Sequence, residues 1–389
     1  MQKSLLLFLL FVAVLPVHAM EKTTVAQLEQ KLTAAHGKQD KDLAKKLGGL
    51  ELTERLNSQR LASIQAGLPG DKSRQALLAI ADASAFLQLP AAEIPATPPP
   101  DALTQKQMLA RAASDLVASV HKLPDFFARQ TTTRFHDLKI SFPASQPVVL
   151  EHQAFYPLDS FSDTIYYRNG KEEVESAEKQ SKTKTRTSKG LVNWGVFGPM
   201  LRMVVLDIYK GKMEWSHWEQ LSTGPVAVFH FAVPKERSHY VVEYCCLGLT
   251  NEPWHEFEST PPFHGEIALD PATGAVYRLM LSTDLQPTDP IFRADVMVEY
   301  EPVEIGGKVY VCPRKSVTIT TAISPIVHQS RCGNGDCAAP YVEKPKDTAI
   351  NDMVFDSYHV FRSEARILTE GSAGQDDLPA PVPPVAPGP

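Results

Sequence analysis

The sequence predicts an α+β protein in which a helical N-terminal segment precedes a long antiparallel, curled β-sheet with one covering helix. Over residues 20–122, apolar side chains recur at the three-to-four-residue spacing of amphipathic helices. From Asp125 onward the period changes to two, and short strand-like runs are separated by tight-turn residues. Such a series is typical of a meander, and at about ten strands a meander has to curl or close. We therefore expect a half-barrel-like sheet.

The N-terminus has the three parts of a cleavable signal peptide. Lys3 supplies a positive charge, residues 4–17 form an apolar run, and the run ends in the small-residue pattern that leads to Ala19. The apolar run, of about 14 residues, is shorter than the roughly 20 that a membrane-spanning helix needs. We expect cleavage near Ala19 and export to the periplasm or the extracellular space. The mature chain is expected to be soluble and not an integral membrane protein.

Composition divides the chain of 389 residues into five parts. The stretch between Leu89 and Pro100 holds five prolines, which neither a helix interior nor a central strand tolerates. It therefore predicts a semi-rigid linker. The expected parts are a signal peptide (1–19), a helical segment (20–88), the Pro-rich linker (89–103), an antiparallel β domain with a leading helix (104–370) and a disordered Pro-rich tail (371–389).

Three helices have recognisable ends. Asp71 is expected to cap a helix over Lys72–Leu87, and another helix is expected over Thr104–His121. The covering helix is expected to start at Pro199, a residue that suits a first turn, and to carry an apolar stripe as far as Tyr209.

Two hairpins give the clearest strand pairs. Gly265–Asp270 and Ala275–Leu281 flank a Pro-Ala-Thr-Gly turn, and Asp295–Val303 and Val309–Thr320 flank a Gly-Gly turn. The remaining strands are expected at Phe127–Phe135, Val148–Tyr156, Thr164–Tyr167, Val226–Val233, Tyr240–Cys246 and Met353–Ile367.

The charge pattern bears on partners. A net charge of −6 argues against nucleic acid as the main partner, because phosphate-binding surfaces usually carry a basic excess. Acidic residues from Glu172 are followed by basic residues up to Lys189. This segregated run predicts a long exposed loop, and the alternative is a docking site for an anionic surface.

The five cysteines are compatible with an oxidising compartment. Cys332 and Cys337 enclose a Gly-Asn-Gly-Asp turn, so we expect a disulfide between them. Cys245 and Cys246 are adjacent in a predicted strand and point to opposite faces, so one of them could reach Cys312. One thiol is then left over.

The string Trp215-Ser-His217-Trp218-Glu219 is the strongest candidate for a ligand-binding site. In a regular strand, Trp215, His217 and Glu219 share one face and Trp218 takes the other. These four residues would then form an aromatic lip with polar contacts beside an apolar cavity. The alternative is a pair of large aromatic residues that close the end of a sheet.

No catalytic residue, metal or cofactor is predicted. The sequence lacks a nucleophile elbow, a phosphate-binding loop, a dinucleotide fingerprint and a paired metal-ligand motif. It leaves open whether the protein is an enzyme, and it favours that it is not.

Residues 125–370 resemble, in pattern, the half-barrel of bacterial lipoprotein carriers and envelope-stress sensors. The resemblance rests on the signal peptide, the long meander, the Pro-capped helix and the two hairpins. It implies a curled sheet that holds acyl chains or a peptide. The strings Gly265–Gly274 and Val298–Lys308 also resemble a group of uncharacterised secreted bacterial proteins. The helical segment and the Cys332–Cys337 loop depart from the carrier pattern.

We therefore expect a non-enzymatic exported envelope protein that binds an apolar ligand, a lipid or a protein partner on its sheet. One alternative is an interaction module that uses the N-terminal helices. The other is a secreted hydrolase whose site is assembled from distant residues, with the candidates His217, Glu219, His264 and Glu266.

Overall fold

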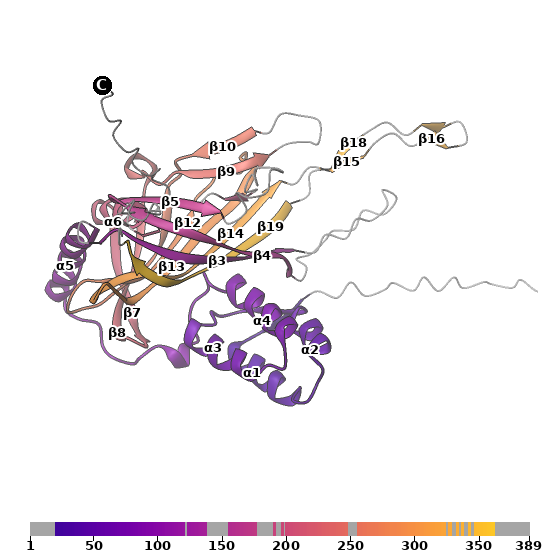
Figure 1. The fold of residues 1–389 in the computed structure, drawn as a ribbon, viewed down its shortest axis with the longest axis horizontal. Helices are drawn as coiled ribbons and strands as arrows, with labels where there is room; N and C mark the ends of the chain where they lie inside the picture. Colours follow the sequence, from indigo (N-terminus) through magenta and orange to yellow (C-terminus); the bar gives the residue numbers. More distant parts are fainter. Residues whose placement is uncertain are drawn as a thin grey trace, which may run out of the picture.

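The computed structural model is a mixed α/β structure built on a large antiparallel sheet that is not closed (Figure 1). It describes residues 20–120, 123–137, 155–176, 190–191, 196–197, 199–247, 255–323, 326–328, 332–333, 336–337, 341–343 and 346–361. The predicted signal peptide, the Pro-rich tail and most of the predicted strand at Val148–Tyr156 lie outside these residues. None of the described helices is long and apolar enough to cross a membrane.

Within the part of the chain that the structure describes, the large sheet has ten strands, and every neighbouring pair in it is antiparallel. From one edge to the other the order is β5 (Lys171–Ser176), β4 (Phe155–Arg168), β3 (Phe126–Asp137), β19 (Lys346–Val360), β14 (Lys308–Ile323), β13 (Ile291–Ile305), β12 (Val276–Thr283), β11 (Phe263–Leu269), β8 (Gly224–Val233) and β7 (Lys212–Leu221). The first and last strands of this order are its edges.

After residue 104, the described residues form three smaller sheets beside the large one. The first is three-stranded, with the order β10 (His255–Ser259), β9 (Val242–Leu247) and β6 (Gly190–Leu191). Two short pairs follow β14 in the chain: β15 (Ile326–His328) with β18 (Tyr341–Glu343), and β16 (Cys332–Gly333) with β17 (Asp336–Cys337).

Both predicted hairpins are confirmed, because their turns have the backbone that the sequence requires. Gly274, Gly306 and Gly307 all have positive φ, which costs glycine little.

The prediction of a loop from Glu172 is wrong for its first part. Residues 171–176 pair with β4 as the edge strand β5, so the acidic side chains lie on an edge, where charge discourages further pairing. Residues 177–189 lie outside the described part.

The N-terminal layer, as we call the elements from Glu21 to Ala83, packs around a small core of its own. Its elements are β1 (Glu21–Thr23), α1 (Val25–Ala34), α2 (Asp40–Leu47), β2 (Leu50–Leu52), α3 (Ser58–Ala66) and α4 (Asp71–Ala83). The fully buried Val25, Leu28 and Leu77 lie in this core. The expectation of a purely helical segment missed β1 and β2, which pair in parallel, since strands of three residues leave no periodicity.

The start of α4 also differs from the prediction. The N-cap residue is Gly70, not Asp71. The backbone N–H groups of Lys72 and Ser73 donate instead to the carboxylate of Asp40 in α2. A side chain from another helix therefore accepts the hydrogen bonds that a capping side chain at the start of α4 was expected to accept.

The large sheet is covered on both faces. Its inner face packs against α6 (Pro199–Lys210) and α5 (Ala102–Val120), with Phe126, Phe229 and Val204 fully buried between them. Its outer face packs against α4, where Ala79 meets strand residues such as Met297. Figure 1 shows α1–α4 grouped on one side of the sheet, and α6, β9 and β10 on the opposite side.

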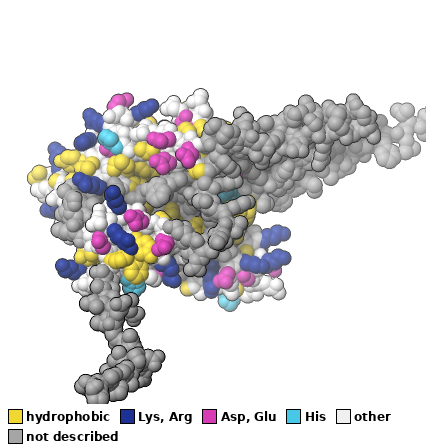
Figure 2. Space-filling model, turned by 45° about the horizontal axis from the view of Figure 1, so that its top comes forward, with side chains coloured by type: hydrophobic (Ala, Val, Ile, Leu, Met, Phe, Trp, Pro, Cys, Tyr) yellow, Lys and Arg dark blue, Asp and Glu magenta, His cyan; other side chains and the backbone are white. Residues whose placement is uncertain are grey.

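The predicted linker runs from the N-terminal layer towards edge strand β7. It contains a short 3-10 helix, η1 (Ala91–Glu93), and the indole Nε1 of Trp218 donates to the carbonyl of Pro98 at 3.0 Å. On the molecular face displayed in Figure 2, basic and acidic side chains are interspersed among hydrophobic ones. Neither charge sign dominates that face.

Candidate functional site

A β-bulge at Ser216 divides the predicted ligand-binding residues between the two faces of β7. Trp215 lies opposite Phe229 and His217 lies opposite Val228, so Ser216 is an extra residue in this strand. Trp215 and Trp218 consequently share the inner face, with ring centroids 5.0 Å apart, and both pack against the inner core. The expectation that Trp215 shares a face with His217 and Glu219 is therefore wrong.

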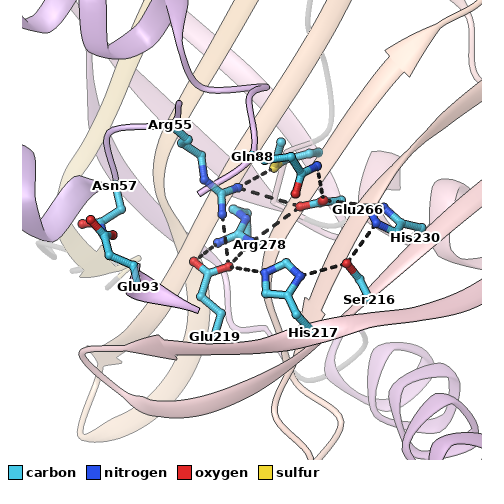
Figure 3. Close-up of polar contacts among 11 residues, drawn as sticks. Arg55, Asn57, Gln88, Glu93, Ser216, His217, Glu219, His230, Glu266 and Arg278 are labelled. Carbon is cyan, nitrogen blue, oxygen red and sulfur yellow. Dashed lines mark hydrogen bonds and ion pairs between the residues drawn. The ribbon is translucent and has the colours of Figure 1, made fainter. Parts of the chain in front are cut away.

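Glu219 lies at the centre of a buried ion-pair network on the outer face (Figure 3). The guanidinium of Arg278 donates to both of its carboxylate oxygens, at 2.6 and 2.5 Å. The guanidinium of Arg55, from the N-terminal layer, donates to the same carboxylate at 3.1 Å. Each of these three side chains is at most 5% exposed, so the network belongs to the interior.

Burial sets the electrostatics of this network. It lowers the pKa of Arg55 to about 10, helped by the positive charge of Arg278. Burial alone would raise the pKa of Glu219, but the paired guanidinium of Arg278 and the charge of Arg55 outweigh it and hold that pKa well below its usual range. Both groups are charged at neutral pH.

Glu266 of β11 completes the network. Its carboxylate lies 3.9 Å from the guanidiniums of both Arg55 and Arg278, and the side-chain amide of Gln88 donates to it at 3.1 Å. Arg55 lies within the N-terminal layer, between β2 and α3, and Gln88 follows the layer in sequence. The network thus connects that layer to strands β7, β11 and β12.

Ser216 lies between two histidines, each of which faces one of these carboxylates (Figure 3). Its Oγ is 2.8 Å from Nδ1 of His217 and 2.9 Å from Nε2 of His230. His217 in turn lies 3.8 Å from Glu219, and His230 lies 3.5 Å from Glu266. The result is a continuous polar chain, Glu-His-Ser-His-Glu, along the outer face.

The sequence found only part of this chain. His217, Glu219 and Glu266 do come together, whereas His264 makes a separate ion pair with Asp284 at 3.1 Å. Ser216 and His230 were missed as members of a site. Both join the others because of the bulge and the β7–β8 register, which a single sequence does not reveal.

A second buried cluster surrounds Lys315 of β14. Its ammonium lies 2.7 Å from Asp82 at the end of α4 and 3.1 Å from Asp352 of β19. Glu299 of β13 is the cross-strand partner of Lys315 and accepts a hydrogen bond from Ser58 at 2.5 Å. Burial raises the pKa of Asp82 to about 8; Lys315 opposes the rise and Asp352 adds to it. Asp82 therefore favours its protonated form near neutral pH.

A cleft of about 160 Å³ lies between these two clusters. One wall comes from the segment 55–61 and the end of α4, and the other comes from the β7–β8 turn and strands β12 to β14. Within its lining, Nε of Arg55, Nε of Arg278 and Oδ2 of Asp82 are buried and have no hydrogen-bond partner. Among the described residues, no group of three or more His, Cys, Asp or Glu side chains could hold a metal ion.

Neither a family model, nor a curated protein, nor a solved structure matches this chain. The geometry of the site is therefore the basis for any functional assignment.

The cysteines bear on the predicted disulfides. Cys332 and Cys337 lie opposite each other in the β16–β17 pair, but their side chains lie outside the described part, so the disulfide stays a prediction. Cys312 is a free thiol and is 1% exposed. The expected bond from Cys245 or Cys246 to Cys312 is therefore wrong. Burial raises the pKa of the Cys312 thiol to about 12.

Proposed function

We propose that the protein is a non-enzymatic, exported envelope protein that binds a ligand or a partner segment in the cleft between its N-terminal layer and its curled, half-barrel-like sheet. The observation that carries this proposal is the cleft of about 160 Å³ between the N-terminal layer and the sheet, which has charged and polar side chains on both walls. A concave site with a few converging polar groups is a common form of ligand-binding site.

The lining suggests a ligand with several polar groups. Asn57, Ser58, Ser222, Thr223 and Tyr277 add amide and hydroxyl groups to the charged side chains of the cleft. The inner face, by contrast, is filled by its own side chains, including those of α6. The outer face therefore suits a ligand better than the apolar interior of the curled sheet, which is where the resemblance to lipoprotein carriers would place acyl chains.

Binding also agrees with the state of the charged groups. Glu219 is held by two guanidiniums, and Lys315 is held between two carboxylates. Paired groups of this kind can orient a ligand or hold two layers together.

Native mass spectrometry tests the proposal. The protein is purified under non-denaturing conditions from the cells that express it. The wild-type protein is expected to carry a bound species whose mass identifies it. The substitution Thr223→Trp, which places a large side chain in the cleft wall, is expected to remove that species. Lys308→Trp, on an exposed turn outside the lining, is the matched control. A wild-type protein free of ligand, or a bound species that survives Thr223→Trp, contradicts the proposal.

A second candidate, a secreted hydrolase, is favoured by one specific observation. Ser216 has a histidine at hydrogen-bond distance and a carboxylate behind that histidine, which is the order of groups in a serine nucleophile. It ranks second because the carboxylate of Glu219 is already neutralised by Arg278 and Arg55, and so stabilises an imidazolium only weakly. Labelling by a fluorophosphonate probe in the wild type, and its loss in Ser216→Ala, would favour the hydrolase; an unlabelled wild type would reject it.

A further inference from the structure

The joint between the N-terminal layer and the sheet contains more carboxylates than cations. Its cations are Arg55, Arg278 and Lys315, and its carboxylates are Asp82, Glu219, Glu266, Glu299 and Asp352. Glu299 is half-buried, and the other four carboxylates are buried. Burying an unpaired charge is expensive, so an excess of carboxylates is expected to bind protons.

The excess is concentrated around Lys315. Asp82 approaches it from α4, Asp352 from β19 and Glu299 from β13. The other charged groups that face this cluster are Arg55 from the N-terminal layer, Arg278 from β12, and the ion pair of Arg314 and Glu301 at the mouth of the cleft. A single ammonium therefore contacts two carboxylates and has a third, that of Glu299, on the neighbouring strand, and Oδ2 of Asp82 has no hydrogen-bond partner.

We propose that this joint is a proton-operated latch: the N-terminal layer docks with a proton held on Asp82, beside the carboxylates of Asp352 and Glu299, and it loosens when that proton leaves to solvent. The raised pKa of Asp82 supports this assignment and identifies Asp82 as the principal site of the proton. Protonated Asp82 keeps its contact with Lys315 and removes one of the uncompensated charges.

The layer is built in a way that permits loosening. Its own core, with Leu28, Leu47 and Leu77, is separate from the inner core of the sheet. The Pro-rich linker connects it to the rest of the chain. Because the cleft lies in the joint, loosening also changes the cleft, so the effect on ligand binding rests on the proposed function. The proton linkage itself does not.

The sign of the effect follows from linkage. A carboxyl whose folded pKa is raised binds more protons in the folded state than in the unfolded state between the two pKa values. The stability of the docked protein therefore falls as pH rises from about 4 to about 8, with the last part of the loss near neutral pH.

Chemical denaturation of the full chain between pH 6 and pH 9 tests the latch. In the wild type, the folding equilibrium is expected to shift towards unfolding by up to about tenfold per pH unit over the first part of this range. Asp82→Asn, which mimics the protonated carboxyl, is expected to flatten that dependence. Asp71→Asn is the matched control, because Asp71 lies on the same helix with its side chain 90% exposed, and it should keep the wild-type slope.

Two further measurements keep the test decisive. Hydrogen exchange, corrected for its intrinsic pH dependence, should show protection lost in α4 before β13 as pH rises. If Asp82→Asn does not fold, Asp352→Asn serves instead, because removal of the neighbouring charge should lower the pKa of Asp82 and shrink the slope. A flat wild-type profile, or the wild-type slope in Asp82→Asn or Asp352→Asn, overturns the latch and leaves the binding proposal untouched. A protein that carries no bound species in native mass spectrometry overturns the binding proposal. It leaves the predicted pH dependence of stability unaffected.

Discussion

The guanidinium of Arg278 and the carboxylate of Glu219 form two parallel hydrogen bonds, at 2.6 and 2.5 Å, with both side chains only 4% exposed. Arg278→Met keeps the bulk and removes the charge, so that Glu219 keeps only Arg55 as a close cation. Breaking a buried pair in this way costs about 3–5 kcal/mol. We expect a loss of this size in the free energy of unfolding, measured by urea denaturation at pH 7.

Arg314 and Glu301 supply the control for this prediction. They form an ion pair at 3.3 Å, but their side chains are 50% and 45% exposed. Exposed pairs contribute about 0–1 kcal/mol, so Arg314→Met should be nearly neutral. Equal losses in the two variants would mean that burial does not decide the strength of the Arg278 pair.

Glu219 should govern stability on the acid side. Its folded pKa lies well below the 4.5 that is ordinary for a glutamate, so its contribution is present above that pH and is lost as pH falls below it. Glu219→Gln should therefore be less stable than the wild type at pH 7, by about 3 kcal/mol. The gap should narrow as the pH is lowered from 5 to 2. A gap that stays constant with pH would exclude this role.

Among Gly274 and Gly307, Gly274 should lose more stability when it is replaced by alanine. Its φ is +85°, and a Cβ there would lie 2.5 Å from the backbone of Arg111 and Ala112 in α5. Gly307 has a similar φ of +80°, but no atom lies within 4 Å of the Cβ position. We expect Gly307→Ala to cost about 1 kcal/mol through backbone strain and Gly274→Ala about 2–4 kcal/mol through strain and overpacking. Thermal denaturation of both variants compares them, and a smaller loss for Gly274→Ala would contradict the packing argument.

The Cys312 thiol should resist alkylation in the folded protein. It is buried, and its pKa is raised to about 12, so the reactive thiolate is scarce at pH 8. Iodoacetamide labelling, read by mass spectrometry of the Cys312 peptide, should be slow without denaturant and fast in urea. Rapid labelling of the folded protein would show that β14 opens readily.

The parts of the fold that follow from local rules could be predicted from the sequence. The hairpin turns at Gly274 and Gly306 are examples. A glycine that can adopt positive φ, and the alternation of apolar and polar residues on either side of it, can both be read from a few neighbouring residues. The buried networks could not. Arg55 and Glu219 are 164 residues apart, and Asp82 and Lys315 are 233 apart. Only the docking of one layer on another brings them together, and the bulge at Ser216 shifted the alternation on which the predicted site relied.

The pairing of β3 with β19 has a consequence for the order in which the molecule can be assembled. These two strands are the third and fourth of the ten described strands of the sheet, yet residues 138–345 separate them in the chain. A chain that emerges N-terminus first can form its successive hairpins early, but it cannot join β3, β4 and β5 to the rest of the sheet until β19 arrives. Asp352, which completes the cluster around Lys315, lies on that same strand. Strand β19 therefore completes the sheet late in assembly. A chain cut short before β19 would leave the N-terminal layer without its complete docking surface.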